Sequence, residues 1–256
     1  MWGFRGGQPA KLKFRVGVKG GTMEEGKTAY VRSVLKEAND LILSREGWFL
    51  FPTESSDGRT NSQQGEHQVA EFLLNHPSLP GVFVKKDVKN GKTNDEDNRA
   101  FGDIGIDISR FGFTKPFPCN IKIISESNKA GNNACGLTNL IGYTFETKCP
   151  NHESVMETLI HLDKDGYDTC VPLLYGLIMV QKESKKCWTG TFDEVPDKCI
   201  GTNPSNPLQV PFLTDRVSRT NKEYITLLIN KIVEYHTKKS KPLAMWNSYQ
   251  ASKKAQ

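Results

Sequence analysis

Two short stretches of alternating polar and apolar residues constrain the fold more than any other feature of the sequence. Residues 103–108 read Asp-Ile-Gly-Ile-Asp-Ile, and residues 119–124 read Cys-Asn-Ile-Lys-Ile-Ile. A period of two is typical of a strand with one buried face and one polar face. The segment 111–118 between them contains glycine and prolines, which favour a turn. We therefore expect two neighbouring strands of one sheet, with their isoleucines in the core.

Helical patterns occur on both sides of these strands. Apolar residues at helical spacing predict helices over residues 24–44, from residue 65 to the prolines at 77 and 80, over 137–144 and over 221–235. Further strands are expected over 81–85 and 171–182. The second of these should be buried and is expected to pair with 188–192. A loop rich in Pro, Asn and Gly is expected over 196–211. Helices that flank the strands on both sides in the sequence predict an α/β or α+β fold, built as a single domain over residues 1–256.

The net charge of +5 is unevenly distributed. Residues 1–21 and 238–256 each contain five Lys or Arg and no acid, so these ends together carry +10 and residues 22–237 carry −5. Basic ends of this kind either contact nucleic acid or another acidic surface, or are solvated and flexible. An acidic body argues against a general polyanion binder. If the partner is nucleic acid, the acids are available to bind a metal ion.

Composition excludes several other classes of protein. Hydrophobic residues make up 37% of the chain, and no apolar run approaches the roughly 18–20 residues of a membrane-spanning helix. The first residues lack the apolar stretch of a signal peptide, so we expect a cytoplasmic protein without membrane contact. None of the six cysteines forms a C-x-x-C pair, which argues for reduced thiols and against a zinc site.

The polar face of the two predicted strands carries the groups needed for Mg²⁺-assisted phosphodiester hydrolysis. Asn120 and Lys122 share one face of their strand, as Asp103 and Asp107 do on theirs. Carboxylate and amide oxygens are suitable ligands for Mg²⁺, which polarises a phosphate and lowers the pKa of bound water. A lysine orients that water or stabilises charge on phosphorus.

This arrangement resembles the PD-(D/E)XK nucleases, and among them the type II restriction endonucleases. The resemblance rests on Gly102-Asp103 at a strand start, on Asn120-Ile121-Lys122 with Asn120 seventeen residues after Asp103, and on a helical stretch that contains Glu66. It covers about residues 60–145. It implies a restriction-endonuclease-like mixed central sheet flanked by helices, with Asp103, Asn120 and Glu66 as Mg²⁺ ligands and Lys122 as the residue that positions the attacking water.

The sequence departs from the family pattern at two positions. Gly102 replaces the usual proline, and Asn120 replaces the usual acid of the second motif. An amide at position 120 is either a natural variant, as in some small restriction enzymes, or an inactivating substitution. Asp107 lies about 13 Å from Asp103 along an extended strand, so only one of the two acids can share a metal with Asn120. The family layout favours Asp103, which leaves Asp107 as a solvated or DNA-side acid.

Candidate DNA contacts lie in polar segments near these residues. Base-reading candidates are Ser125, Ser127, Asn128, Lys129, Asn132 and Asn133 after the catalytic lysine, together with Gln63 and Gln64. Lys85 and Lys86 are expected to contact phosphates. Ordinary polar turns are the alternative for each of these segments.

The sequence therefore predicts a Mg²⁺-dependent, sequence-specific endonuclease that cuts double-stranded DNA and acts as a monomer or homodimer. A repair or structure-specific nuclease on the same scaffold is one alternative. A non-catalytic DNA-binding protein with a nuclease-like fold is another, and Asn120 keeps it open. An interaction protein that does not bind nucleic acid is the third.

Overall fold

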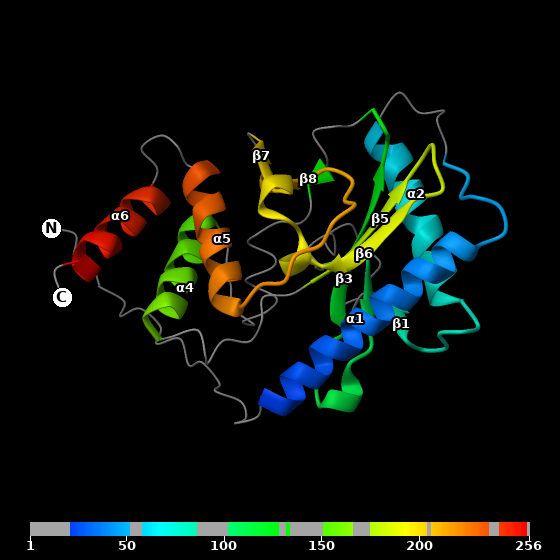
Figure 1. The fold of residues 1–256 in the computed structure, drawn as a ribbon, viewed down its shortest axis with the longest axis horizontal. Coiled ribbons are helices and arrows are strands. Elements are labelled where there is room, and N and C mark those ends of the chain that lie inside the picture. The colour runs from blue at the N-terminus through cyan, green and yellow to red at the C-terminus, as the bar shows by residue number, and fades with distance from the viewer. Residues whose placement is uncertain are drawn as a thin grey trace, which may run out of the picture.

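A computed structural model describes residues 21–51, 58–85, 102–127, 132–133, 151–165, 175–203, 206–235 and 241–254. Within these ranges, helices surround a five-stranded mixed sheet, and a smaller three-stranded sheet lies beside it (Figure 1). The mixed α/β class expected from the sequence is confirmed.

The five-stranded sheet contains the two predicted neighbouring strands at its centre. In spatial order its strands are β1 (Phe83–Lys85), β2 (Ile104–Ile106), β3 (Phe117–Ile124), β5 (Gly176–Gln181) and β6 (Cys187–Thr191). β2 and β3 pair antiparallel, with Ile104 opposite Cys119. β3 then pairs parallel with β5, where Cys119 lies opposite Gly176. β2 is shorter than expected, and β3 begins two residues earlier.

The burial of β3 and β5 follows from their sequences. Ile121 and Ile123 of β3 are buried, and so is every residue of β5. A parallel pair is normally covered on both faces, which explains why residues 176–180 of β5 are apolar without alternation, although the strand ends at the buried polar Gln181. The buried strand predicted over 171–182 is confirmed for residues 176–181, whereas 171–174 lie outside the described residues.

Helix α1 (Gly21–Ser44) packs on the sheet through the predicted apolar stripe. Val31, Leu35 and Ile42 are fully or almost fully buried, which matches the helical spacing of the sequence. The hydroxyl of Thr189 in β6 donates a hydrogen bond of 2.6 Å to the carbonyl oxygen of Leu35. This bond fastens the middle of α1 to the sheet.

Helix α2 (Gly58–Leu74) begins seven residues before the predicted start at Gly65. Gly65 instead lies inside the helix, where α2 passes close to β3. A Cβ atom at this position would lie 2.8 Å from the ring of Phe51 and 3.0 Å from the side chain of Ile123. Gly65 therefore permits the close approach that brings the next residue, Glu66, to the sheet.

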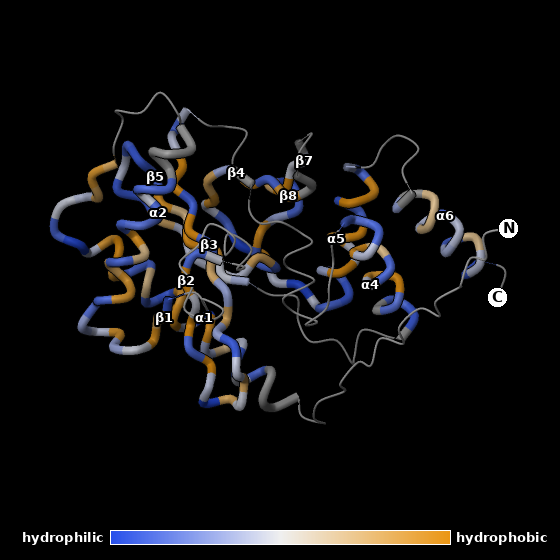
Figure 2. The backbone as a smooth tube through the Cα atoms, turned by 180° about the vertical axis from the view of Figure 1, so that it is seen from behind, coloured by the Kyte–Doolittle hydropathy of each residue, from blue (hydrophilic) through white to orange (hydrophobic). Residues whose placement is uncertain are grey.

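The rest of the described chain forms a second group of elements. It comprises β4 (Asn132–Asn133), α4 (His152–Asp165), β7 (Gly201–Asn203), β8 (Asn206–Val210), α5 (Asn221–Tyr235) and α6 (Lys241–Lys254). Figures 1 and 2 show α4, α5 and α6 side by side, on the far side of the small sheet from β3. Hydrophobic and hydrophilic residues alternate along α5, whose predicted apolar face is buried.

One part of this region differs from the prediction, and for two others the outcome is partial or untested. The loop expected over 196–211 contains β7, β8 and a short 3-10 helix, Asp197–Cys199. The basic end at residues 238–256, for which contact with an acidic surface and a solvated, flexible state were both open, contains α6, whose Tyr249 hydroxyl and Lys253 ammonium lie 2.5 and 2.8 Å from Oδ2 of Asp163 in α4. The helix predicted over 137–144 lies outside the described residues, as does the first basic end up to residue 20.

No described helix is long and apolar enough to cross a membrane.

Candidate active site

β3 places the two polar residues of the Asn-x-Lys motif on one face. Ile121 and Ile123 are buried on the opposite face, in agreement with the predicted alternation. Asn120 is itself buried, opposite Leu177 of β5, and the Lys122 side chain is 16% exposed. The lysine therefore lies near the protein surface, while the amide lies deeper.

Gly102 fixes the start of β2 against β3. Its φ of +90° is in the region that favours glycine, and a Cβ atom there would lie 3.0 Å from O and 3.1 Å from N of Cys119. Proline, with φ locked near −65°, cannot adopt this conformation. Glycine is therefore the residue that fits the backbone of this chain at position 102.

Asp103 is held directly across from the motif on β3. Its backbone N–H donates to the carbonyl oxygen of Cys119 at 2.7 Å. Its carboxylate Oδ2 accepts a hydrogen bond of 2.6 Å from the backbone N–H of Ile121. The same oxygen lies 3.8 Å from Nζ of Lys122. Two backbone positions of β3 thus orient the carboxylate toward the lysine.

Glu66 reaches the same lysine from α2. Its Oε1 accepts a hydrogen bond of 3.2 Å from Nζ of Lys122. Burial raises the pKa of Glu66, and the negative charge of Asp103 raises it further, while Lys122 opposes the shift. A buried acid beside a second acid is poised to take up a cation or a proton.

The structure therefore brings Glu66, Asp103 and Lys122 together from three separate elements. Asn120 lies on the same face of β3, two residues before the lysine. Among the described residues, no group of three His, Cys, Asp or Glu side chains could hold a metal ion. The candidate ligands are instead two carboxylates and one amide, a set of oxygen donors of the kind that suits Mg²⁺.

Asp107 is engaged elsewhere. Its Oδ1 accepts the backbone N–H of Ser109 at 2.8 Å, and its Oδ2 accepts the Ser109 hydroxyl at 3.2 Å. These hydrogen bonds lower the pKa of Asp107. The carboxylate thus supports the 3-10 helix Ser109–Phe111. Of the two acids on this strand, Asp103 is the one beside Lys122.

The candidate base-reading segment begins with a turn held by an acid that sequence reasoning missed. Oε1 of Glu183, between β5 and β6, accepts the Ser125 hydroxyl at 2.5 Å, and its Oε2 accepts the N–H of Glu126 at 2.9 Å. Ser125 and Ser127 hydroxyls lie 2.9 Å apart. Desolvation alone would raise the pKa of Glu183, but these hydrogen bonds outweigh it and lower the pKa. No local pattern links residues so distant in sequence.

The remaining DNA-contact candidates are spread over several elements. Gln63 and Gln64 are exposed on α2 in the turn before Glu66, and Lys85 is exposed at the end of β1. Asn132 and Asn133 form β4 and pair with Val210 and Gln209 of β8. Lys86, Asn128 and Lys129 lie outside the described residues.

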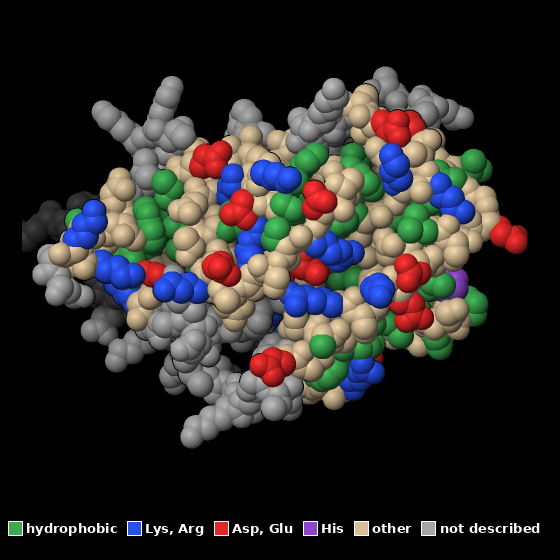
Figure 3. All heavy atoms as spheres, in the orientation of Figure 1, with side chains coloured by type: hydrophobic (Ala, Val, Ile, Leu, Met, Phe, Trp, Pro, Cys, Tyr) green, Lys and Arg blue, Asp and Glu red, His purple; other side chains and the backbone are tan. Residues whose placement is uncertain are grey.

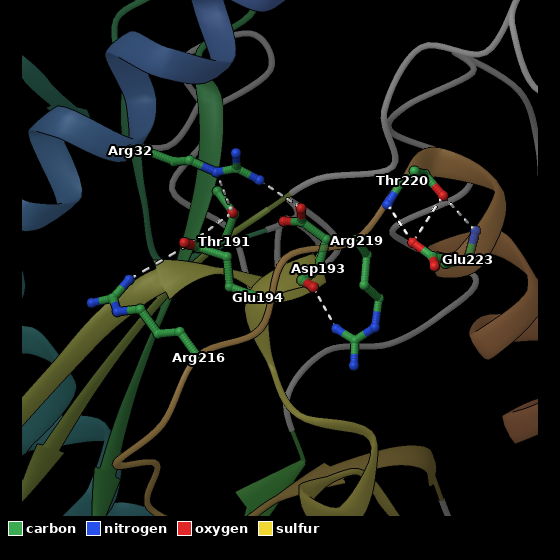
Figure 4. Close-up of polar contacts among 8 residues, drawn as sticks. All are labelled: Arg32, Thr191, Asp193, Glu194, Arg216, Arg219, Thr220 and Glu223. Atoms are coloured by element: carbon green, nitrogen blue, oxygen red, sulfur yellow. Dashed lines mark hydrogen bonds and ion pairs between the residues drawn. The ribbon is translucent and has the colours of Figure 1, made fainter.

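A second polar cluster, also missed from the sequence, joins α1 to the segment after β6 (Figure 4). Arg32 of α1 donates to Oδ2 of the buried Asp193 at 2.6 Å. Arg219 bonds the Asp193 carbonyl and the Asp197 carboxylate. Burial raises the pKa of Asp193, opposed by Thr191 and Arg32. Because these arginines already bind acids, the cluster serves to connect elements.

Charges of both signs are mixed on the surface drawn in Figure 3. Among the described residues of this face, Lys and Arg side chains are interspersed with Asp and Glu and form no continuous basic stripe. A DNA-binding face usually concentrates positive charge. This view therefore does not single out the visible face as a DNA contact surface.

Comparison with known proteins does not assign this chain to a family. A scan of the sequence against models of known protein families finds no match, and a search of curated proteins finds no significantly similar sequence.

Proposed function

We propose that this protein is a Mg²⁺-dependent endonuclease of the restriction type, which hydrolyses phosphodiester bonds in double-stranded DNA at a short recognition site. One observation carries the proposal: Glu66, Asp103 and Lys122, which are far apart in sequence, meet at one point beside Asn120. Two acids, an amide and an ammonium on neighbouring elements are the parts that this chemistry requires.

The order of elements supports the resemblance to the PD-(D/E)XK nucleases. A helix that carries an acid, α2, precedes a strand led by Asp103 and then a strand that carries Asn120 and Lys122. These strands belong to a mixed sheet flanked by helices, which is the architecture that the resemblance implies.

The residues divide into ligands and a positioning group. Asp103, Asn120 and Glu66 would hold Mg²⁺ through their side-chain oxygens. When bound, Mg²⁺ polarises the phosphate and lowers the pKa of a bound water. Lys122 orients the attacking water and stabilises the negative charge that develops on the phosphate. Because Asn120 contributes no charge, Mg²⁺ should bind more weakly than in a site with three carboxylates.

A non-catalytic DNA-binding protein is the second candidate function. The neutral amide of Asn120 favours it, since this residue stands where the related nucleases have an acid. DNA binding that is sequence-specific and independent of metal would be its signature.

Plasmid digestion separates these functions. We expect the wild-type protein with Mg²⁺ to produce discrete fragments, and Lys122→Ala to bind DNA without cutting it. A structure-specific nuclease would instead cut flap or mismatch substrates and give no discrete plasmid fragments. Absence of cleavage by both the wild type and Asn120→Asp would overturn the enzymatic proposal.

A further inference from the structure

The ammonium of Lys122 lies inside the group of oxygens that the proposed function assigns to Mg²⁺. Its Nζ is 3.2 Å from Oε1 of Glu66, 3.8 Å from Oδ2 of Asp103 and 2.8 Å from the carbonyl oxygen of Ile121. Lys122 is therefore the cation that lies beside both acids and offsets one of their two charges. The charge of the whole cluster is close to that of one uncompensated carboxylate.

Mg²⁺ and the Lys122 ammonium cannot both bind these oxygens tightly at the same time. Mg²⁺ requires oxygen atoms at about 2.0–2.1 Å and removes them from other strong partners. Like charges a few ångströms apart in a partly buried place repel each other strongly. Glu66 and Asp103 are only 19% and 30% exposed, so water screens this repulsion incompletely.

The lysine side chain is able to move out of this position. Lysine has a flexible four-carbon stem with a single charged tip. Among the described residues, Nζ contacts Glu66, Asp103 and the Ile121 carbonyl, and the side chain retains contact with solvent. The contact to Glu66 joins two side chains, so its loss removes no backbone hydrogen bond of β3.

We propose that Lys122 is an internal competitor for the divalent cation: its ammonium occupies the acids until the cation binds, and is then released toward water and phosphate. This inference rests on the proposed function and adds a regulatory step to it. Lys122 becomes free to orient the attacking water only after the cation has bound. Without the cation, its ammonium stays bound to Glu66 and Asp103.

The first test is a titration of the protein with Mg²⁺ in the absence of DNA. Isothermal titration calorimetry measures the affinity. Lys122→Met removes the charge but retains much of the side-chain volume. Lys231→Met is the matched control, because Lys231 is 15% exposed and pairs with Glu234 at 2.9 Å on α5. We expect Lys122→Met to bind Mg²⁺ about fivefold more tightly than the wild type, which corresponds to roughly 1 kcal/mol. Lys231→Met should match the wild type.

The second test uses the wild-type protein and therefore does not depend on the folding of a variant. The protein is labelled with a limiting amount of an amine-acetylating reagent at rising Mg²⁺ concentration, and peptides are quantified by mass spectrometry. Acetylation of Lys122 should increase with Mg²⁺ saturation, because the released side chain is accessible to the reagent instead of being held between Glu66 and Asp103. Acetylation of Lys231 should stay constant.

The outcomes separate this inference from the function on which it rests. If the wild type cuts DNA with Mg²⁺ but Lys122→Met binds Mg²⁺ no more tightly, or acetylation of Lys122 stays constant or falls, the competitor role is wrong and the nuclease proposal stands. If the wild type neither binds Mg²⁺ nor cuts DNA, both proposals fail together.

Discussion

Replacement of Gly102 by alanine should be among the most damaging single-methyl changes in this protein. Gly102 has a φ of +90°, and an added Cβ would lie 3.0 Å from O and 3.1 Å from N of Cys119. Both are backbone atoms of β3, so they cannot move aside as a flexible side chain would. The strain therefore falls on the contact that positions Asp103.

The expected loss of stability has two parts. A non-glycine residue in the left-handed region costs about 1–2 kcal/mol. Relief of the close contact requires β2 to move away from β3, which weakens the 2.7 Å hydrogen bond from Asp103 N–H to the Cys119 carbonyl by about 1 kcal/mol. Gly102→Ala should therefore lower the free energy of unfolding by about 2–3 kcal/mol.

Gly112→Ala is the matched control. Gly112 has a similar φ of +78°, but a Cβ there would meet no atom within 4 Å. This variant should lose only the conformational part, about 1–2 kcal/mol. Urea denaturation followed by circular dichroism measures both losses, and DNA cleavage should decline only in Gly102→Ala. Equal destabilisation of the two variants would refute the claim that Cys119 crowds position 102.

Three further predictions address charge. Asn120→Asp should bind Mg²⁺ about tenfold more tightly in calorimetry, because it adds a carboxylate to the ligand set; unchanged affinity would exclude residue 120 as a ligand. Because burial raises the pKa of Glu66 above its ordinary 4.5, protons should displace Mg²⁺ at a higher pH than from an exposed glutamate, and Glu66→Gln should remove this pH dependence in the same titration. Arg32→Ala leaves the buried Asp193 without its 2.6 Å partner and should cost about 1–2 kcal/mol in urea denaturation, a moderate value because Arg32 is 41% exposed. The exposed control for Arg32→Ala is Lys198→Ala, which removes the partner of Asp215 at 4.0 Å and should cost under about 0.5 kcal/mol.

The central part of the fold could be predicted because its signals are local. Alternation in residues 103–108 and 119–124 depends only on which face of a strand is buried, and it predicts the pairing of β2 with β3. The same alternation places Asn120 and Lys122 on one face. That Glu66 lies beside Lys122 came from the family resemblance, since 56 residues separate the two.

Other features depend on tertiary contacts that leave no local pattern. The segment 196–211 is rich in turn-forming residues, yet it contains β7 and β8, because pairing within the small sheet outweighs low strand propensity. Helix α6 lacks a clear apolar stripe and is attached to α4 through Asp163. The Arg32–Asp193 pair joins residues 161 positions apart, which no periodicity indicates.

The most direct test of the central claim compares two acids from the same strand region. Asp103→Ala and Asp107→Ala each remove one carboxylate, but only Asp103 lies beside Lys122, whereas Asp107 binds Ser109. The measurement is the rate of Mg²⁺-dependent plasmid cleavage. We predict that Asp103→Ala abolishes cleavage and that Asp107→Ala cuts as the wild type does. Wild-type cleavage by Asp103→Ala, or loss of cleavage in Asp107→Ala alone, would contradict the proposed active site.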